Sequence, residues 1–188
     1  MIRSLNTVRP IHHPLILLLL AALLSSCARP MIRRQAPGAK LGSIAALNGL
    51  RNDVNGAYGF RDGVPRVNLG PCGRFAKAFR EQWNGRFSEK INIAFVMSQD
   101  NGMCHHVVVR LPDGSYFDGG NGLLTGEELT SLWPGSHIEE MTKFDLKLLD
   151  QRSYGLKRKY PVCPNYSDEL TDKMIERCLT AMLAAGYR

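Results

Sequence analysis

Three residues of this chain have the types that thiol chemistry requires: Cys72, His106 and Asp118. In such a site a cysteine attacks a carbonyl carbon, a histidine moves the proton, and a carboxylate orients and stabilises the imidazolium. Cys72 lies in the sequence Gly70-Pro71-Cys72-Gly73, in which the two glycines leave room for a substrate. A helix is predicted to begin at or just after this cysteine, and the positive end of a helix dipole favours a thiolate. We therefore expect Cys72 to be the nucleophile, His106 the base and Asp118 the orienting group.

Whether His106 can meet Asp118 depends on the register of a predicted β-hairpin. Between its two strands lies Pro112-Asp113-Gly114, which fits a three-residue loop with glycine in the left-handed position. This loop would pair Val108 with Asp118, so that His106 shares a face with Asp118 and lies diagonal to it. A two-residue Asp-Gly turn would shift the register by one residue and place His105 there instead. The proline favours the first register, and therefore His106.

Acyl transfer also needs hydrogen-bond donors for the developing oxyanion. The backbone N–H of Cys72 is the default donor, and the side chain of Asn68 is a candidate for the second. A metal site at Cys104-His105-His106 is disfavoured, because consecutive residues of a strand point to opposite faces. The sequence also lacks the usual glycine-rich motifs for phosphates or dinucleotides and the serine-hydrolase motif. We therefore expect neither a metal nor a cofactor.

The surrounding sequence predicts the elements that must hold these residues. After Cys72, apolar residues repeat at helical spacing as far as Asn84-Gly85. Strands are predicted at residues 91–97, 105–111 and 115–118 from their content of β-branched and aromatic side chains. Residues 44–70 are rich in glycine and asparagine and are expected to be mainly loop.

Two further helices are predicted downstream. Thr125 and Glu128 have the spacing of a capping box, which opens a short helix through Trp133. The last helix is expected from about Asp168 to Ala185, with Ser167 as its N-cap and Gly186 as its stop. Residues 144–149 fit a strand or a helix equally well.

The motifs around Cys72 and His106 resemble those of papain-like and transglutaminase-like bacterial cysteine hydrolases. The resemblance lies in Cys72-Gly73-Arg74-Phe75-Ala76 and in the hairpin from His106 to Asp118. It implies an α+β fold with an N-terminal catalytic helix packed on a small antiparallel sheet, followed by a C-terminal helix. The cell-wall endopeptidase branch usually has an aspartate before its cysteine, whereas Pro71 stands there in this chain, which counts against that branch.

The N-terminus has the features of an export signal. A basic stretch precedes an apolar run of ten residues, 15–24, whereas a membrane-spanning helix needs about 20. The run ends in Leu24-Ser25-Ser26-Cys27, which resembles the lipobox of bacterial lipoproteins. This resemblance implies that residues 1–27 are a lipoprotein signal peptide with its lipobox, that cleavage occurs just before Cys27, and that Cys27 is acylated. Ala28 rather than aspartate follows, which implies an outer-membrane location facing the periplasm. The alternative is a plain signal peptide with an incidental cysteine.

The length and charge of the chain limit its possible domain organisation and its possible partners. Residues 28–43 lack apolar periodicity and are expected to be a tether, and residues 44–188 to form one domain. The chain has 188 residues and a net charge of +7. Two of its basic residues, Arg3 and Arg9, lie in the leader, and the remaining excess is too small to indicate a nucleic-acid partner.

The remaining cysteines would lie in an oxidising compartment if the chain is exported. Cys163 and Cys178 bracket the start of the last helix and are expected to form a disulfide; the alternative is two buried thiols. Cys72 and Cys104 could pair with each other, or one of them could be a reactive thiol. A disulfide between them would argue against catalysis.

Two classes of function remain open. In the first, the protein is a lipid-anchored hydrolase of the cell envelope that cleaves amide or isopeptide bonds of peptides or peptidoglycan. In the second, it is a non-catalytic envelope lipoprotein that uses the same fold as a binding or assembly module.

Overall fold

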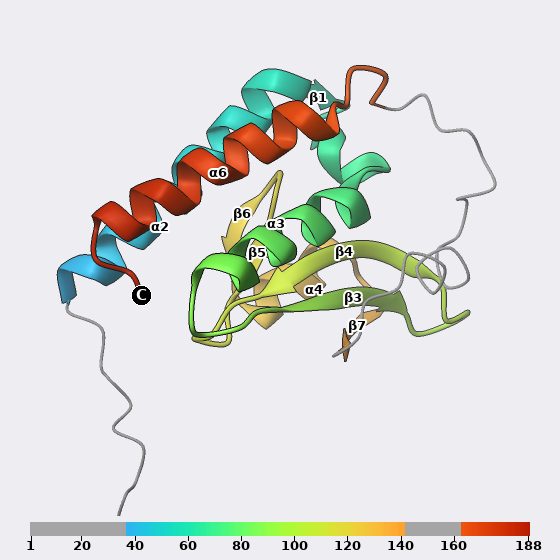
Figure 1. The fold of residues 1–188 in the computed structure, drawn as a ribbon. Coiled ribbons are helices and arrows are strands. Elements are labelled where there is room, and N and C mark those ends of the chain that lie inside the picture. The colour runs from blue at the N-terminus through green and yellow to red at the C-terminus, as the bar shows by residue number, and fades with distance from the viewer. Residues whose placement is uncertain (1–36, 142–162) are drawn as a thin grey trace, which may run out of the picture. The chain divides into compact units, whose positions relative to one another are not determined.

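The computed structural model describes residues 37–141 and 163–188, and these form an α+β fold (Figure 1). Its helices are α2 (Pro37–Tyr58), the 3-10 helix η2 (Arg66–Leu69), α3 (Cys72–Arg86), α4 (Gly126–Leu132) and α6 (Asp168–Ala184). Its strands are β1 (Phe60–Arg61), β2 (Val64–Pro65), β3 (Asn92–Ser98), β4 (Cys104–Arg110), β5 (Tyr116–Asp118), β6 (Gly122–Leu124) and β7 (Ser136–Met141). The predicted leader with Cys27 and the ambiguous residues 144–149 lie outside the described residues.

The centre of the fold is an antiparallel sheet of five strands in the order β6-β5-β4-β3-β7. Its two middle strands, β3 and β4, are buried on both faces, which explains their nearly continuous apolar sequence. One face, which carries Val107 and Val109, packs into the main core beneath α3. The opposite face, which carries Val108, packs against Leu129 of α4. A separate hairpin, β1–β2, connects α2 to η2.

Helix α3 is held on the sheet by aromatic side chains. Phe75 and Phe79 project from successive turns of α3 and contact Phe117 of β5, with ring centroids 6.3 and 5.2 Å from it. All three side chains are buried. Because such rings bury large apolar areas and interlock, this packing fixes the N-terminus of α3 relative to β5.

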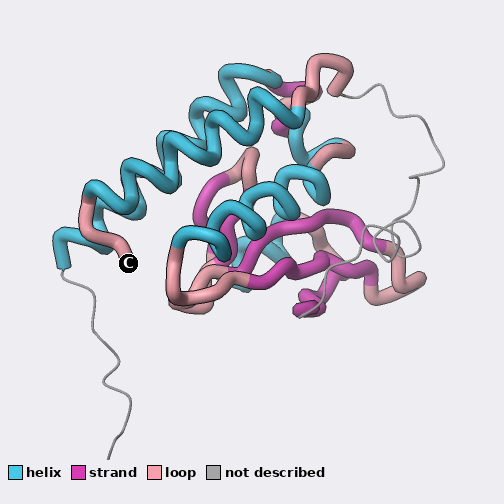
Figure 2. The backbone as a smooth tube through the Cα atoms, viewed as in Figure 1, coloured by secondary structure: helices cyan, strands magenta, loops and turns pink. Residues whose placement is uncertain are grey.

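Helices α2 and α6 run side by side in a layer beyond α3 (Figures 1 and 2). The two helices are antiparallel: Gly42, near the start of α2, packs against Ala185, just beyond α6. At the other end, the hydroxyl of Tyr58 lies 2.7 Å from Thr171 Oγ1 and 3.0 Å from the carbonyl oxygen of Ser167. A side chain at residue 42 would collide with Ala185, so glycine permits this close approach.

The prediction of a loop at residues 44–70 is wrong for most of that segment. Residues 44–58 belong to α2, which also includes residues 37–43 of the predicted tether. Leu47, Leu50, Val54 and Tyr58 recur every three or four residues and are buried against the core. Glycine and asparagine lower helix propensity by less than about 1 kcal/mol each, and burial of this apolar stripe outweighs that cost.

The other predicted elements are confirmed with small changes at their ends. The helix after Cys72, the three strands and the last helix are present as α3, β3, β4, β5 and α6. Thr125 and Glu128 form both hydrogen bonds of a capping box on α4, and Ser167 caps α6. Among the described residues, no helix is both long enough and apolar enough to cross a bilayer.

Candidate active site

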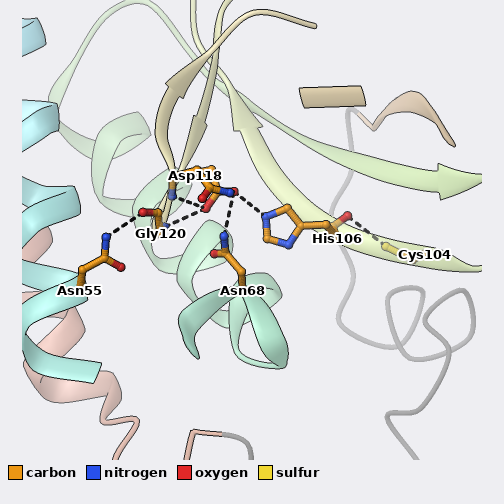
Figure 3. Close-up of polar contacts among 7 residues, drawn as sticks. Asn55, Asn68, Cys104, His106, Asp118 and Gly120 are labelled. Carbon is orange, nitrogen blue, oxygen red and sulfur yellow. Dashed lines mark hydrogen bonds and ion pairs between the residues drawn. The ribbon is translucent and has the colours of Figure 1, made fainter. Parts of the chain in front are cut away.

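The predicted hairpin register is confirmed. Val109 pairs with Phe117 and Arg110 with Tyr116, and Gly114 has the left-handed conformation that the loop requires, with φ of 87°. The ladder between β4 and β5 ends with these pairs. Beyond it the imidazole of His106 points from β4 toward β5 (Figure 3). Its Nε2 lies 2.9 Å from Asp118 Oδ2.

The choice between the two neighbouring histidines is therefore settled in favour of His106 as the partner of Asp118. The side chains of His106 and Asp118 are almost completely buried. His105, which has no pairing partner at the irregularity between β3 and β4, is exposed.

The carboxylate of Asp118 receives hydrogen bonds from four residues (Figure 3). Its Oδ1 accepts from the backbone N–H of Gly120 at 2.7 Å and of Asn121 at 3.2 Å. Its Oδ2 interacts with His106 and accepts from the side-chain amides of Asn121 at 2.9 Å and Asn68 at 3.1 Å. Burial alone would raise the pKa of Asp118, but His106 and the two N–H groups outweigh it and lower that pKa. Asp118 is thus held as an anion.

Two glycines after Asp118 allow the chain to make this tight turn. A side chain at Gly119 would lie 2.8 Å from the ring of Phe75, and one at Gly120 would lie 2.8 Å from the amide of Asn68. The Nδ2 of Asn55, on α2, donates to the carbonyl oxygen of Gly120 at 2.8 Å. The turn is therefore fixed from both α3 and α2.

Asn68 has a different contact from the one expected. The sequence suggested it as an oxyanion donor, whereas its buried side-chain amide donates to Asp118 (Figure 3). Asn121 and Asn55 were not predicted as site residues at all. The sequence Asp118-Gly119-Gly120-Asn121 contained a signal for a tight turn, but the partner of Asn55 lies 65 positions away.

Trp133 is a further residue of the site that the sequence did not reveal. It follows α4 and is stacked on His106, with ring centroids 4.4 Å apart and planes 15° apart. Trp133 is partly exposed, whereas His106 is 1% exposed. The indole therefore covers one face of the imidazole, and its ring can stabilise an imidazolium.

The environment of His106 favours its charged form. Burial alone lowers its pKa, but the negative charge of Asp118, that of an ionised Cys72 and the hydrogen bond to Asp118 raise it to about 10. Since Nε2 faces Asp118, Nδ1 is the ring nitrogen left for the thiol. Nδ1 is buried and lacks a conventional hydrogen-bond partner among the described residues. The arrangement can hold a thiolate–imidazolium pair.

Cys72 is the first residue of α3 and is partly exposed. Pro71 at the N-cap provides no side-chain hydrogen bond to the first turn, and the first intrahelical bond runs from the N–H of Phe75 to the carbonyl oxygen of Pro71. The N–H groups of Cys72 and Gly73 therefore precede the hydrogen-bonded part of the helix. Such groups can bind a developing oxyanion.

The predicted disulfide between Cys163 and Cys178 is not present, and both residues are thiols. Helix α6 begins at Asp168 and is continuous, so Cys178 lies about 15 Å along its axis from the end near Cys163. A disulfide requires Cα atoms within about 7 Å. Burial raises the pKa of Cys178 to about 12 and also raises that of Cys163.

Cys72 and Cys104 are not joined to each other either. Cys72 is a thiol, and the buried Sγ of Cys104 donates to the carbonyl oxygen of His106 at 3.2 Å (Figure 3). Within residues 37–141 and 163–188, no group of three or more histidine, cysteine or acidic side chains is placed to hold a metal ion.

Comparison with known proteins found no matching family model, no similar curated protein and no similar solved structure.

Proposed function

We propose that this protein is a thiol hydrolase that cleaves amide or isopeptide bonds with Cys72, His106 and Asp118. The observation that carries the proposal is the buried 2.9 Å contact between His106 Nε2 and Asp118 Oδ2. The electrostatic influence of Cys72, which raises the pKa of the same imidazole, also supports it. A histidine between a carboxylate and a thiol at a helix N-terminus is the arrangement that a cysteine nucleophile needs.

The reaction would proceed in two steps. The Sγ of Cys72 attacks the carbonyl carbon, and the N–H groups at the start of α3 stabilise the oxyanion. The C–N bond then breaks while His106 gives its proton to the leaving amine, which leaves a thioester on Cys72. In the second step His106 takes a proton from water, the hydroxide attacks the thioester, and the acid is released as the thiol re-forms.

We also propose a family relationship for this protein and a location in the cell envelope. A helix that begins at the cysteine and packs on an antiparallel sheet carrying the histidine and aspartate supports a relationship to papain-like and transglutaminase-like hydrolases. The lipobox-like sequence ending at Cys27 supports a lipid-anchored protein at the outer membrane, facing the periplasm. Peptides and peptidoglycan-like amides are the substrates such a location offers.

Alkylation of Cys72 by iodoacetamide at pH 7, followed by mass spectrometry, tests the proposal. We expect Cys72 to react faster than a model thiol of pKa ~8.5, because the imidazolium stabilises its thiolate. His106→Ala should reduce the alkylation rate of Cys72 to that of the model thiol. His105→Ala, the same change at an exposed neighbour, should leave the faster rate unchanged. If Cys72 is unreactive in the folded protein, the hydrolase is excluded and the binding-module alternative is favoured.

A further inference from the structure

A pocket of about 560 Å³ lies beside the turn that holds Asp118. Its walls come from α2, from the β1–β2 hairpin and from the turn between β5 and β6, and they include Arg51, Asn55, Gly56, Phe60, Pro65 and Asn121. The volume is in the range of sites for small molecules or for part of a peptide. A larger groove between α3 and α6 has charged walls that pair within the chain, as Arg86 does with Glu176, so we do not assign it a ligand.

The charge of the pocket favours an anion. Of the described residues that line it, Arg51 alone carries a formal charge. Its guanidinium is oriented by Asn52, whose Oδ1 accepts from Nη2 at 3.0 Å and from Nε at 3.3 Å. Its stem lies over Gly122, where an added Cβ would be 2.9 Å from Arg51 Cδ. The rest of the planar guanidinium can bind a carboxylate through two parallel hydrogen bonds.

The hairpin supplies an apolar wall. Phe60 and Pro65 are cross-strand partners and both line the pocket. Pro65 is buried, whereas the side chain of Phe60 is 53% exposed. An exposed aromatic ring beside an arginine fits a ligand that carries both an apolar group and a carboxylate.

The pocket also shares residues with the candidate active site. Asn121 lines the pocket and donates to Asp118 through its backbone and its side chain. Asn55 lines it too, fixes the carbonyl of Gly120, and has a buried Oδ1 without a hydrogen-bond partner among the described residues. A ligand here would therefore contact the residues that hold the Asp118 turn.

We propose that this pocket binds a carboxylate-bearing, apolar residue of the peptide-like substrate, with Arg51 on the carboxylate and Phe60 against the side chain. The inference rests on the proposed function, because it assigns the pocket to a substrate of the same site.

Binding of N-acetylphenylalanine to the full-length protein tests the pocket directly, with N-acetylphenylalaninamide as the uncharged control. The backbone amide resonances of Gly120 and Asn121 should shift saturably with the acid and much less with the amide. Arg51→Gln should weaken binding of the acid about tenfold or more, because a charge-assisted pair is lost. Equal binding of both compounds, or an unchanged affinity in Arg51→Gln, would overturn the proposal.

Two glycines of α2 provide a matched pair of variants. Gly56 lines the pocket and Gly49 does not, both are exposed, and a Cβ at either would have nothing within 4 Å. Leucine is a better helix former than glycine, so both Gly56→Leu and Gly49→Leu should fold. Gly56→Leu should block binding of the acid, and Gly49→Leu should bind it like the wild type. Equal effects of the two substitutions would contradict the proposal.

The alkylation of Cys72 separates failure of this inference from failure of the proposed function. A reactive Cys72 with no binding of the acid would refute the pocket and leave the hydrolase in place. Binding of the acid with an unreactive Cys72 would refute the assignment of the pocket to a substrate. Binding by a protein with reactive Cys72 supports both.

Discussion

Replacing Asp118 by asparagine would test the central feature of the site. Among the described residues, the hydrogen-bond partners of the carboxylate are all donors: two backbone N–H groups, two side-chain amides and His106. An asparagine has one acceptor oxygen and one amino group, so it would leave at least one of these donors facing another donor. It would also remove the charge that favours the imidazolium of His106.

The size of the effect follows from the pKa of His106. Burial lowers it, and the charges of Asp118 and the Cys72 thiolate raise it from 6.5 to about 10. An opposite charge in direct contact typically shifts a pKa by about 1–3 units, and one unit corresponds to about 1.4 kcal/mol. Neutralising Asp118 should therefore lower the ratio of the thiolate–imidazolium pair to the neutral pair by about tenfold or more.

The assay is the rate of Cys72 alkylation by iodoacetamide between pH 5 and 10, together with circular dichroism to confirm folding. The wild type should react at a nearly constant rate over the neutral range, because the imidazolium persists until the pH approaches about 10. Asp118→Asn should react at least tenfold more slowly at pH 7, and its rate should rise with pH like that of an ordinary thiol.

A matched control is Asp113→Asn, which removes the same charge from the exposed loop of the same hairpin. It should leave the alkylation profile unchanged. If folded Asp118→Asn had the profile of the wild type, the carboxylate would not sustain the imidazolium and the proposed triad would be refuted.

Substitutions of Trp133, Gly120 and Cys27, two of them with a matched control, test other parts of the structure. Trp133→Leu should move the upper inflection of the pH profile of Cys72 alkylation down by about half a unit to one unit, because a ring worth about 1 kcal/mol to the imidazolium is lost. Trp133→Phe should retain most of the effect, and identical profiles would exclude the stacking role. Gly120→Ala should lower the free energy of unfolding in urea by about 1–3 kcal/mol, because the added Cβ collides with Asn68. The control Gly85→Ala, in open space on α3, should raise it by about 0.5–1 kcal/mol. Equal urea midpoints for the two variants would refute this packing. Cys27→Ser should release the protein from the membrane fraction or block cleavage of the leader, and normal processing with membrane retention would exclude lipidation.

The ionisation of the site also predicts how stability depends on pH. Because its pKa is raised, His106 contributes to the stability of the folded state. This contribution is fully present below pH 6.5 and is lost as the pH rises through about 10. The lowered pKa of Asp118 gives a contribution that is present above its ordinary value and is lost as the pH falls through the lowered one. The free energies of unfolding of the wild type and of Asp118→Asn, measured in urea at several pH values, should therefore differ least at acidic pH.

The contacts that could be predicted are those between residues close in sequence. The Pro112-Asp113-Gly114 loop fixed the register of its hairpin, since turn geometry and strand alternation act over a few residues. The same holds for the capping box at Thr125 and the cap at Ser167. From the register alone, His106 could be preferred to His105 as the partner of Asp118.

The rest of the fold and of the site depends on packing between segments that are distant in sequence. Helix α2 contains several glycines and asparagines of low helix propensity, and burial of its apolar stripe against the core stabilises it. The positions of Asn55 and Trp133 depend on how α2 and α4 pack around the sheet, which no local pattern encodes. By itself the sequence determined the hairpin and the residue types of the site. Only the tertiary structure decided which donors surround Asp118, because that choice depends on segments brought together by burial of apolar surface.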